Sequence, residues 1–119
     1  MRVLCCGDRN WTNSNLILDV LLEYKDIPDM VVIHGGASGA DFLAGEAAKM
    51  LGFKVEVYPA DWNKHGRVAG PIRNQKMLDT KPDHVIAFHD NIAISKGTGH
   101  MISITKKAEI SFEVKTNNG

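Results

Sequence analysis

VVIHGGASGAD, residues 31–41, joins a short apolar run to a glycine-rich turn and then to the start of a helix. Proteins of the α/β class build anion sites in this way, because glycines let the backbone approach an anion and the free N–H groups of the helix start carry positive partial charge. A second segment of this kind, SKGTGH at residues 95–100, follows the apolar run VIAF at residues 85–88. Two such turns in one small domain favour a phosphate-bearing ligand.

Apolar runs alternate with helix-like stretches along the rest of the chain. The expected strands are residues 2–6, 30–34, 54–58, 84–88 and 111–114. The expected helices are residues 14–24, 40–51, 72–78 and 98–107, with Asn13 or Ser14 capping the first and Gly52 ending the second. Strict alternation predicts a three-layer α/β/α Rossmann-like fold, whose five-stranded parallel sheet has the order 3-2-1-4-5.

The length of 119 residues suits one domain, which we expect to span residues 1–114 and to leave a polar, frayed tail at 115–119. A formal net charge of zero argues against a surface that binds duplex DNA mainly through its charge. We expect no membrane association, because no stretch of about 18 apolar residues is present.

Cys5 and Cys6, the two cysteines of the chain, are adjacent within the first expected strand. Neighbouring residues on a strand point to opposite faces, so a bridge between them would be strained. We therefore expect reduced packing residues in a cytoplasmic protein, in preference to a vicinal thiol sensor.

Parallel sheets of this order bind ligands where the chain reverses direction, outside the carboxyl ends of strands 1 and 4. The loops expected there are residues 7–13, 35–41 and 89–98, so both glycine turns should meet at this edge. Residues 59–74 form a long connection whose Arg73 and Asn74 lie early in a helix that should start near the same crevice.

Several residues at this edge have two possible roles. Arg9 could either make a bidentate contact with a phosphate, which we favour, or be a solvated loop charge. Trp11 could either stack on a base or close the end of the core. Asp41 could either bond neighbouring backbone N–H groups and hold the turn, or take part in catalysis. The residues expected to bind the ligand are Gly7, Asp8, Arg9, Trp11, Gly35, Gly36, Ser38, Gly39, Asp41, Asp61, Trp62, Arg73, Asn74, Ser95, Gly97, Thr98 and His100.

No cofactor and no metal site are expected. The five histidines are scattered without the paired spacing that zinc ligands show on a helix, and neither a Walker motif nor a G-x-G-x-x-G fingerprint is present.

These segments resemble the SLOG superfamily, and within it the small YspA/YpsA-related proteins of bacteria and phages. The resemblance spans residues 2–114 and rests on the following motifs: GDRNW at 7–11, HGGASGAD at 34–41, PADW at 59–62, AGPIRNQKM at 69–77, and GT with HM at 97–101. It implies a Rossmann-like fold, a nucleotide or nucleotide-derived ligand, and self-association into dimers or larger assemblies.

The activities within this superfamily are diverse. Lonely Guy phosphoribohydrolases cleave the base–ribose bond of nucleoside monophosphates, the DNA-processing protein A family binds single-stranded DNA, and other members sense NAD-derived signals. The phosphoribohydrolases carry a glutamate a few residues after their second glycine turn. Here the chain continues Gly99-His100-Met101-Ile102, with no acid, and this departure favours binding over hydrolysis.

The sequence therefore predicts a module that senses or sequesters a phosphate-bearing nucleotide or NAD-derived ligand. The alternative is an N-glycoside hydrolase acting on nucleoside monophosphates. Asp41, Asp8 or Asp61 would then replace the glutamate, and His100 or Arg73 would donate to the leaving base. A single-stranded nucleic-acid binder is disfavoured, because it would need a basic groove lined with aromatic residues.

Overall fold

Five parallel strands form one sheet in the order β3-β2-β1-β4-β5, as the alternation of elements predicts. The computed structural model describes residues 1–118. The strands are β1 (Arg2–Gly7), β2 (Val31–His34), β3 (Lys54–Val57), β4 (His84–Phe88) and β5 (Ser111–Lys115). The chain reverses its direction of winding between β1 and β4, whose paired residues run from Val3 beside His84 to Gly7 beside Phe88. The fold class predicted from the sequence is confirmed.

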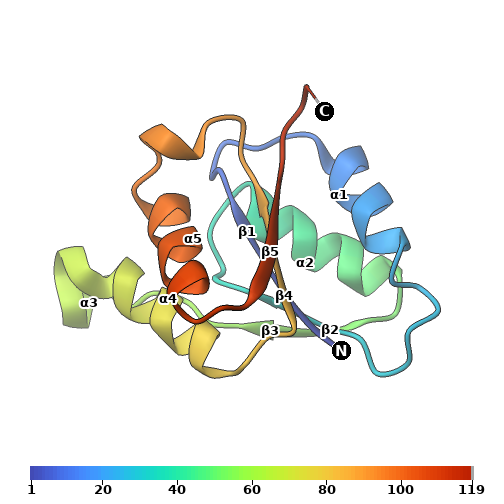
Figure 1. Ribbon diagram of the computed structural model, residues 1–119, viewed down its shortest axis with the longest axis horizontal. Coiled ribbons are helices and arrows are strands. Elements are labelled where there is room, and N and C mark those ends of the chain that lie inside the picture. Colours follow the sequence, from blue (N-terminus) through green and yellow to red (C-terminus); the bar gives the residue numbers. More distant parts are fainter. Residues whose placement is uncertain (119) are drawn as a thin grey trace.

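Helices cover both faces of this sheet (Figure 1). The helices are α1 (Ser14–Leu22), α2 (Ala40–Met50), α3 (Trp62–His65), α4 (Ala69–Asp79) and α5 (Gly97–Lys107), with short 3-10 turns η1 (Gly66–Val68) and η2 (Ile92–Ile94). Figure 1 shows α1 and α2 on one side of the sheet and α4 and α5 on the other. The short helix α3 lies beyond the N-terminal end of α4. None of the helices in residues 1–118 has the length and apolar character needed to cross a membrane.

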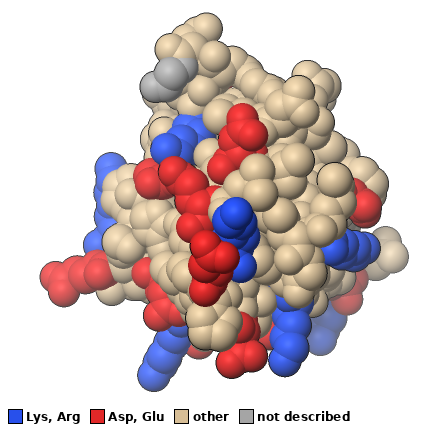
Figure 2. All heavy atoms as spheres, turned by 90° about the vertical axis from the view of Figure 1, so that its right-hand side faces the viewer, with Lys and Arg blue, Asp and Glu red and all other residues tan. Residues whose placement is uncertain are grey.

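Charged side chains are interspersed on the face that Figure 2 shows, where lysine and arginine alternate with aspartate and glutamate. This mixture agrees with the formal net charge of zero. A polyanion gains most from a continuous basic surface, and this face does not provide one.

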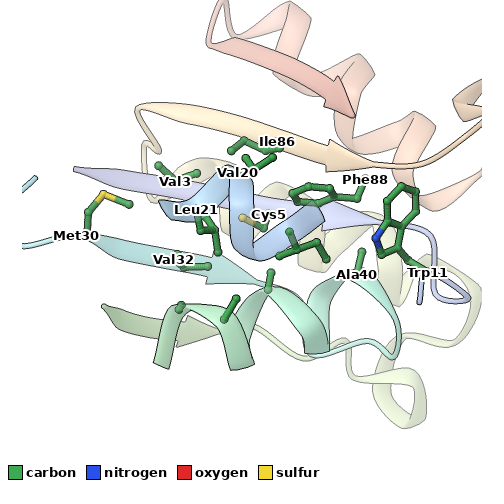
Figure 3. Packing of buried hydrophobic residues seen from close by; sticks show 14 residues of the cluster. Val3, Cys5, Trp11, Val20, Leu21, Met30, Val32, Ala40, Ile86 and Phe88 are labelled. Atoms are coloured by element: carbon green, nitrogen blue, oxygen red, sulfur yellow. The ribbon is translucent and has the colours of Figure 1, made fainter. Parts of the chain in front are cut away.

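The two cores follow from strand periodicity, because successive side chains of a strand point to opposite faces. Val3, Cys5 and Phe88 pack beneath α1 and α2, where Figure 3 shows them with Trp11 at the end of the layer. Leu4 and Cys6 pack beneath α4 and α5. The adjacent cysteines are both free and buried on opposite faces, as expected, and burial raises the pKa of Cys5 to about 12.

Several boundaries differ from those expected by one or two residues, and the start of α4 differs by three. The helix predicted for residues 72–78 begins at Ala69, so Pro71 lies in its first turn, where a missing N–H is tolerated. The tail begins one residue later than predicted, because Lys115 pairs in β5. Asn117 is also anchored: its backbone N–H donates to Asp90 Oδ1 at 2.7 Å, and its Oδ1 accepts from Asn13 Nδ2 at 2.9 Å.

Candidate functional site

The first glycine turn is closed by its own carboxylate. Asp41 Oδ2 accepts hydrogen bonds from the backbone N–H groups of Gly35 at 3.1 Å and Ala37 at 3.2 Å. The N–H of Gly36, between them, donates to His34 Nδ1 at 3.0 Å. Three consecutive donors are thus used inside the protein, which confirms that Asp41 holds the turn.

His34 is a buried acceptor in this arrangement. Burial lowers the pKa of His34, and the positive charge of Lys49 lowers it further, so the ring stays neutral and Nδ1 can accept. Gly45 leaves room for the ring, since a methyl group added there would lie 2.7 Å from His34 Nε2. His34 therefore supports the turn from beneath.

Arg73 connects α4 to the first turn. Its Nη1 donates to Gly35 O at 2.6 Å, and its Nε donates to Asn74 Oδ1 at 3.1 Å. A side chain at Gly35 would collide with Nη1 of Arg73 and lie 2.9 Å from Asp41 Oδ2. The guanidinium is therefore held in one orientation over the glycine turn.

Gly39 lets the first turn pass close to the loop that follows β1. Its φ is +73°, and a side chain there would collide with the backbone of Asp8 and Arg9. Two bonds join the loops at this point, because Ala40 N donates to Asp8 O at 3.0 Å and Ser38 Oγ donates to Arg9 O at 3.2 Å.

The second glycine turn is built differently. Ser95 Oγ accepts from Thr98 N at 3.0 Å, and α5 then begins at Gly97 with no acidic residue in its first turn. By contrast, α2 carries Asp41 in its first turn. The positive end of the α5 dipole is therefore not offset by an acid of its own helix.

Asn74 connects α4 to this second turn. Its Nδ2 donates to Gly97 O at 3.2 Å and lies 3.2 Å from His100 Nδ1. Since the amide nitrogen is a donor, His100 Nδ1 is the acceptor in this contact. Only 6% of Asn74 is exposed, and it joins Arg73 to the start of α5.

Two cavities meet above these turns. The polar cavity, about 230 Å³, lies between the β1 loop, α4 and the start of α5. It is lined by Cys6, Gly7, Asp8, Arg9, Ala37, Asp41, Arg73, Asn74, Met77, His89, Ser95, Lys96, Gly97, Thr98 and Met101. The Trp62 cavity, about 280 Å³, is lined by Arg9, Gly35, Gly36, Ala37, Ser38, Pro59, Ala60, Trp62 and Arg73.

Asp41 is the buried acid of the polar cavity, with 6% of its surface exposed. Burial raises its pKa, while the N–H groups of Ala37 and Gly35 and the charge of Arg73 pull the pKa back down. Its Oδ2 is used by the turn, and its Oδ1 makes no hydrogen bond to any of residues 1–118. A carboxyl oxygen is therefore available beside this cavity.

Comparison with known proteins adds to this geometry. The profile of the YspA, cpYpsA-related SLOG family matches residues 1–65, which include the whole first glycine turn. The Gene 61 protein of Mycobacterium phage D29 is 37% identical over 116 residues, covering 92% of this chain and 91% of that protein. No solved structure matches.

The chain belongs to the YspA, cpYpsA-related SLOG family. The resemblance seen in the sequence motifs is thereby confirmed.

In this SLOG protein, most of the residues expected to bind a ligand line one of the two cavities. Those in the polar cavity are Gly7, Asp8, Arg9, Asp41, Arg73, Asn74, Ser95, Gly97 and Thr98. Those in the Trp62 cavity are Arg9, Gly35, Gly36, Ser38, Trp62 and Arg73. Segments from four loops are thus brought to the predicted edge of the sheet.

Four expected residues line neither cavity. Trp11 is only 4% exposed, packs on Phe88 at 5.9 Å between ring centroids, and donates from Nε1 to Asn13 O, so it closes the core and cannot stack on a base. Asp61 caps α3 by accepting from Lys64 N at 3.1 Å. Gly39 is the close-contact glycine described above, and His100 pairs with Asn74 instead of facing the cavity.

Several lining residues were not among those expected. His89 and Lys96 line the polar cavity, and both belong to the loop between β4 and α5 that the strand order had already placed there. Cys6, Met77 and Met101 supply apolar wall. These three residues were not predicted, because an apolar side chain can lie in a cavity wall or in the core equally well. Within residues 1–118, no group of three or more His, Cys, Asp or Glu side chains is arranged to hold a metal ion.

Proposed function

We propose that this SLOG protein binds a phosphate-bearing, nucleotide-derived small molecule in the polar cavity, and so senses or sequesters it. The observation that carries the proposal is the convergence of Arg9, Arg73 and Lys96 with the start of α5 on one cavity. Since no acid lies in the first turn of α5, an anion is the natural complement of this helix end. Membership of the SLOG family supports a nucleotide-related ligand.

Arg9 and Arg73 have different roles in this proposal. Arg73 is already fixed by its bonds to Gly35 O and Asn74 Oδ1. The Arg9 guanidinium makes no hydrogen bond or salt bridge to any of residues 1–118, and it lines both cavities. A planar guanidinium can contact two phosphate oxygens at once, so Arg9 is free to close on a bound anion.

A second candidate function is hydrolysis of an N-glycosidic bond, and Asp41 is the observation that favours it. The reaction needs a carboxyl group beside the anomeric carbon, where water adds a hydroxyl group as the base leaves with a proton. Asp41 has an available oxygen at the polar cavity and a pKa raised by burial. However, Oδ2 of the same carboxylate already holds the turn, so we place binding first.

The test is to incubate the purified protein with nucleoside monophosphates, NAD and ADP-ribose, and to analyse the retained and filtered fractions by liquid chromatography and mass spectrometry. A ligand retained intact supports binding, and free base in the filtrate supports hydrolysis. Arg9→Gln should weaken retention at least about tenfold, as expected for the loss of a charge-assisted contact. Arg67→Gln is the matched control, because Arg67 lines neither cavity. Equal retention by both variants would contradict the proposed site.

A further inference from the structure

The two cavities share part of their walls. Arg9, Ala37 and Arg73 line both, so the arginines stand at the junction and not at the closed end of either space. Each cavity alone is smaller than the roughly 300 Å³ at the lower end of ligand sites, and together they exceed it. A ligand that fills the site would therefore pass between the two arginines.

The two cavities differ in the charged residues of their walls. The polar cavity contains the carboxylates of Asp8 and Asp41. Asp41 has an oxygen without a hydrogen bond in residues 1–118, and carboxylates at the switch points of α/β sheets accept the hydroxyl groups of ribose. Lys96 and the start of α5, which line the same cavity, suit the phosphate, and the two carboxylates beside them suit the hydroxyl groups of a sugar.

The Trp62 cavity has no acidic residue in its wall and instead contains Pro59, Ala60 and the indole of Trp62. Trp62 is 55% exposed, although tryptophan is one of the residues that gain most from burial. Gly70 of α4 lies next to the ring, since a methyl group added at Gly70 would meet Trp62 Cη2 at 3.5 Å. An exposed aromatic face beside an anion site suits a flat base.

We infer that the ligand is a two-part nucleotide, with its base on Trp62, its phosphate linkage between Arg9 and Arg73, and a second sugar in the polar cavity. The chemical class is that of a nucleoside diphosphate linked to a sugar. This inference rests on the proposed function and adds to it that the phosphate lies in the middle of the ligand.

ADP-ribose and its two halves, AMP and ribose 5-phosphate, are the probes that test this inference. Calorimetric titration should find that ADP-ribose binds at least ten times more tightly than either half. Trp62→Ala should weaken ADP-ribose and AMP about tenfold, the usual effect of removing one stacking partner, and leave ribose 5-phosphate unchanged. Met50→Ala is the control, because Met50 is an exposed apolar residue that lines neither cavity.

The titrations distinguish a failure of the two-part ligand from a failure of the phosphate site. If ribose 5-phosphate binds as tightly as ADP-ribose and Trp62→Ala changes neither, the two-part ligand is wrong and the phosphate site remains. If none of the three probes binds, both proposals are overturned. Thermal denaturation of Trp62→Ala should match that of the wild type, which shows that any loss of binding is not a loss of folding.

Discussion

Both glycine turns follow a strand and lead into a helix, but they differ in which groups accept the hydrogen bonds of their backbone N–H groups. In the first turn, the N–H groups of residues 35, 36 and 37 are used by Asp41 and His34. In the second, Ser95 takes only the N–H of Thr98, and the start of α5 borders the polar cavity. The acid in the first turn of one helix and its absence from the other account for the difference.

The first turn is structural, and we propose that the second takes part in binding. A glycine-rich turn followed by an acid supplies its own anion, so the N–H groups of Gly35 and Ala37 are satisfied before any ligand arrives. The first turn consequently serves as scaffold: it fixes Arg73 through Gly35 O and meets the β1 loop at Gly39. The second turn lacks an internal anion, and we expect it to make the backbone contacts to phosphate.

The largest expected effect is that of a side chain in the structural turn. Gly39→Ala places a methyl group against the backbone of Asp8 and Arg9 at a φ of +73°. Strain in φ and overpacking together should lower the free energy of unfolding by about 3 kcal/mol. Urea denaturation measures this.

Gly52→Ala is the matched control for Gly39→Ala. Its φ of +76° is nearly the same, but nothing lies within 4 Å of an added methyl group. It should cost only about 1 kcal/mol, the part due to φ. Equal losses in the two variants would mean that the close contact at Gly39 can relax.

A smaller effect, on binding alone, is expected in the second turn. Gly97 lines the polar cavity, and a methyl group added there meets nothing within 4 Å. Gly97→Ala should therefore preserve the melting temperature, or raise it slightly because alanine favours helix. Affinity for a phosphate ligand should fall about tenfold if the ligand approaches this backbone closely. Unchanged affinity would remove the second turn from the site.

The smallest effect concerns the charge that closes the first turn. Asp41→Asn keeps one acceptor oxygen, so we expect a loss of about 1 kcal/mol at pH 7. Since folding raises the Asp41 pKa above its usual 3.8, the folded state holds the proton more tightly than the unfolded state. Wild-type stability should thus improve relative to Asp41→Asn as the pH falls from neutral toward 4.

Urea denaturation of both Asp41 proteins at several pH values measures that difference. The other titrating groups are common to the two proteins and cancel in the comparison. A wild type that instead loses stability relative to Asp41→Asn on acidification would show that the turn's N–H groups outweigh the cost of burial.

Most of the fold was predictable because β and α elements alternate without interruption, and the strand order then determines which loops meet. The role of Asp41 as the turn's acceptor was also predictable, since it depends on residues six or fewer positions away. The short helix α3 was not predicted, because four residues, WNKH, carry no apolar period.

Side-chain direction at the site was harder to predict. The choice between Trp11 as stacking face and Trp11 as core residue depends on Phe88, which is distant in sequence. Likewise, the rotation of α5 decides that Gly97, Thr98 and Met101 line the cavity while His100 turns toward Asn74. These side-chain orientations depend on packing between helices and strands, which the local sequence pattern does not determine.

The adjacent cysteines make the two halves of the core separately observable. Cys5 lies beneath α1 and α2, and Cys6 lies beneath α4 and α5, although a single peptide bond joins them. A thiol reagent reaches Cys5 only when the layer above it opens, whereas Cys6 also borders the polar cavity. Single-cysteine variants would therefore compare the opening of the layer beneath α1 and α2 with access from the cavity on the other face of the sheet.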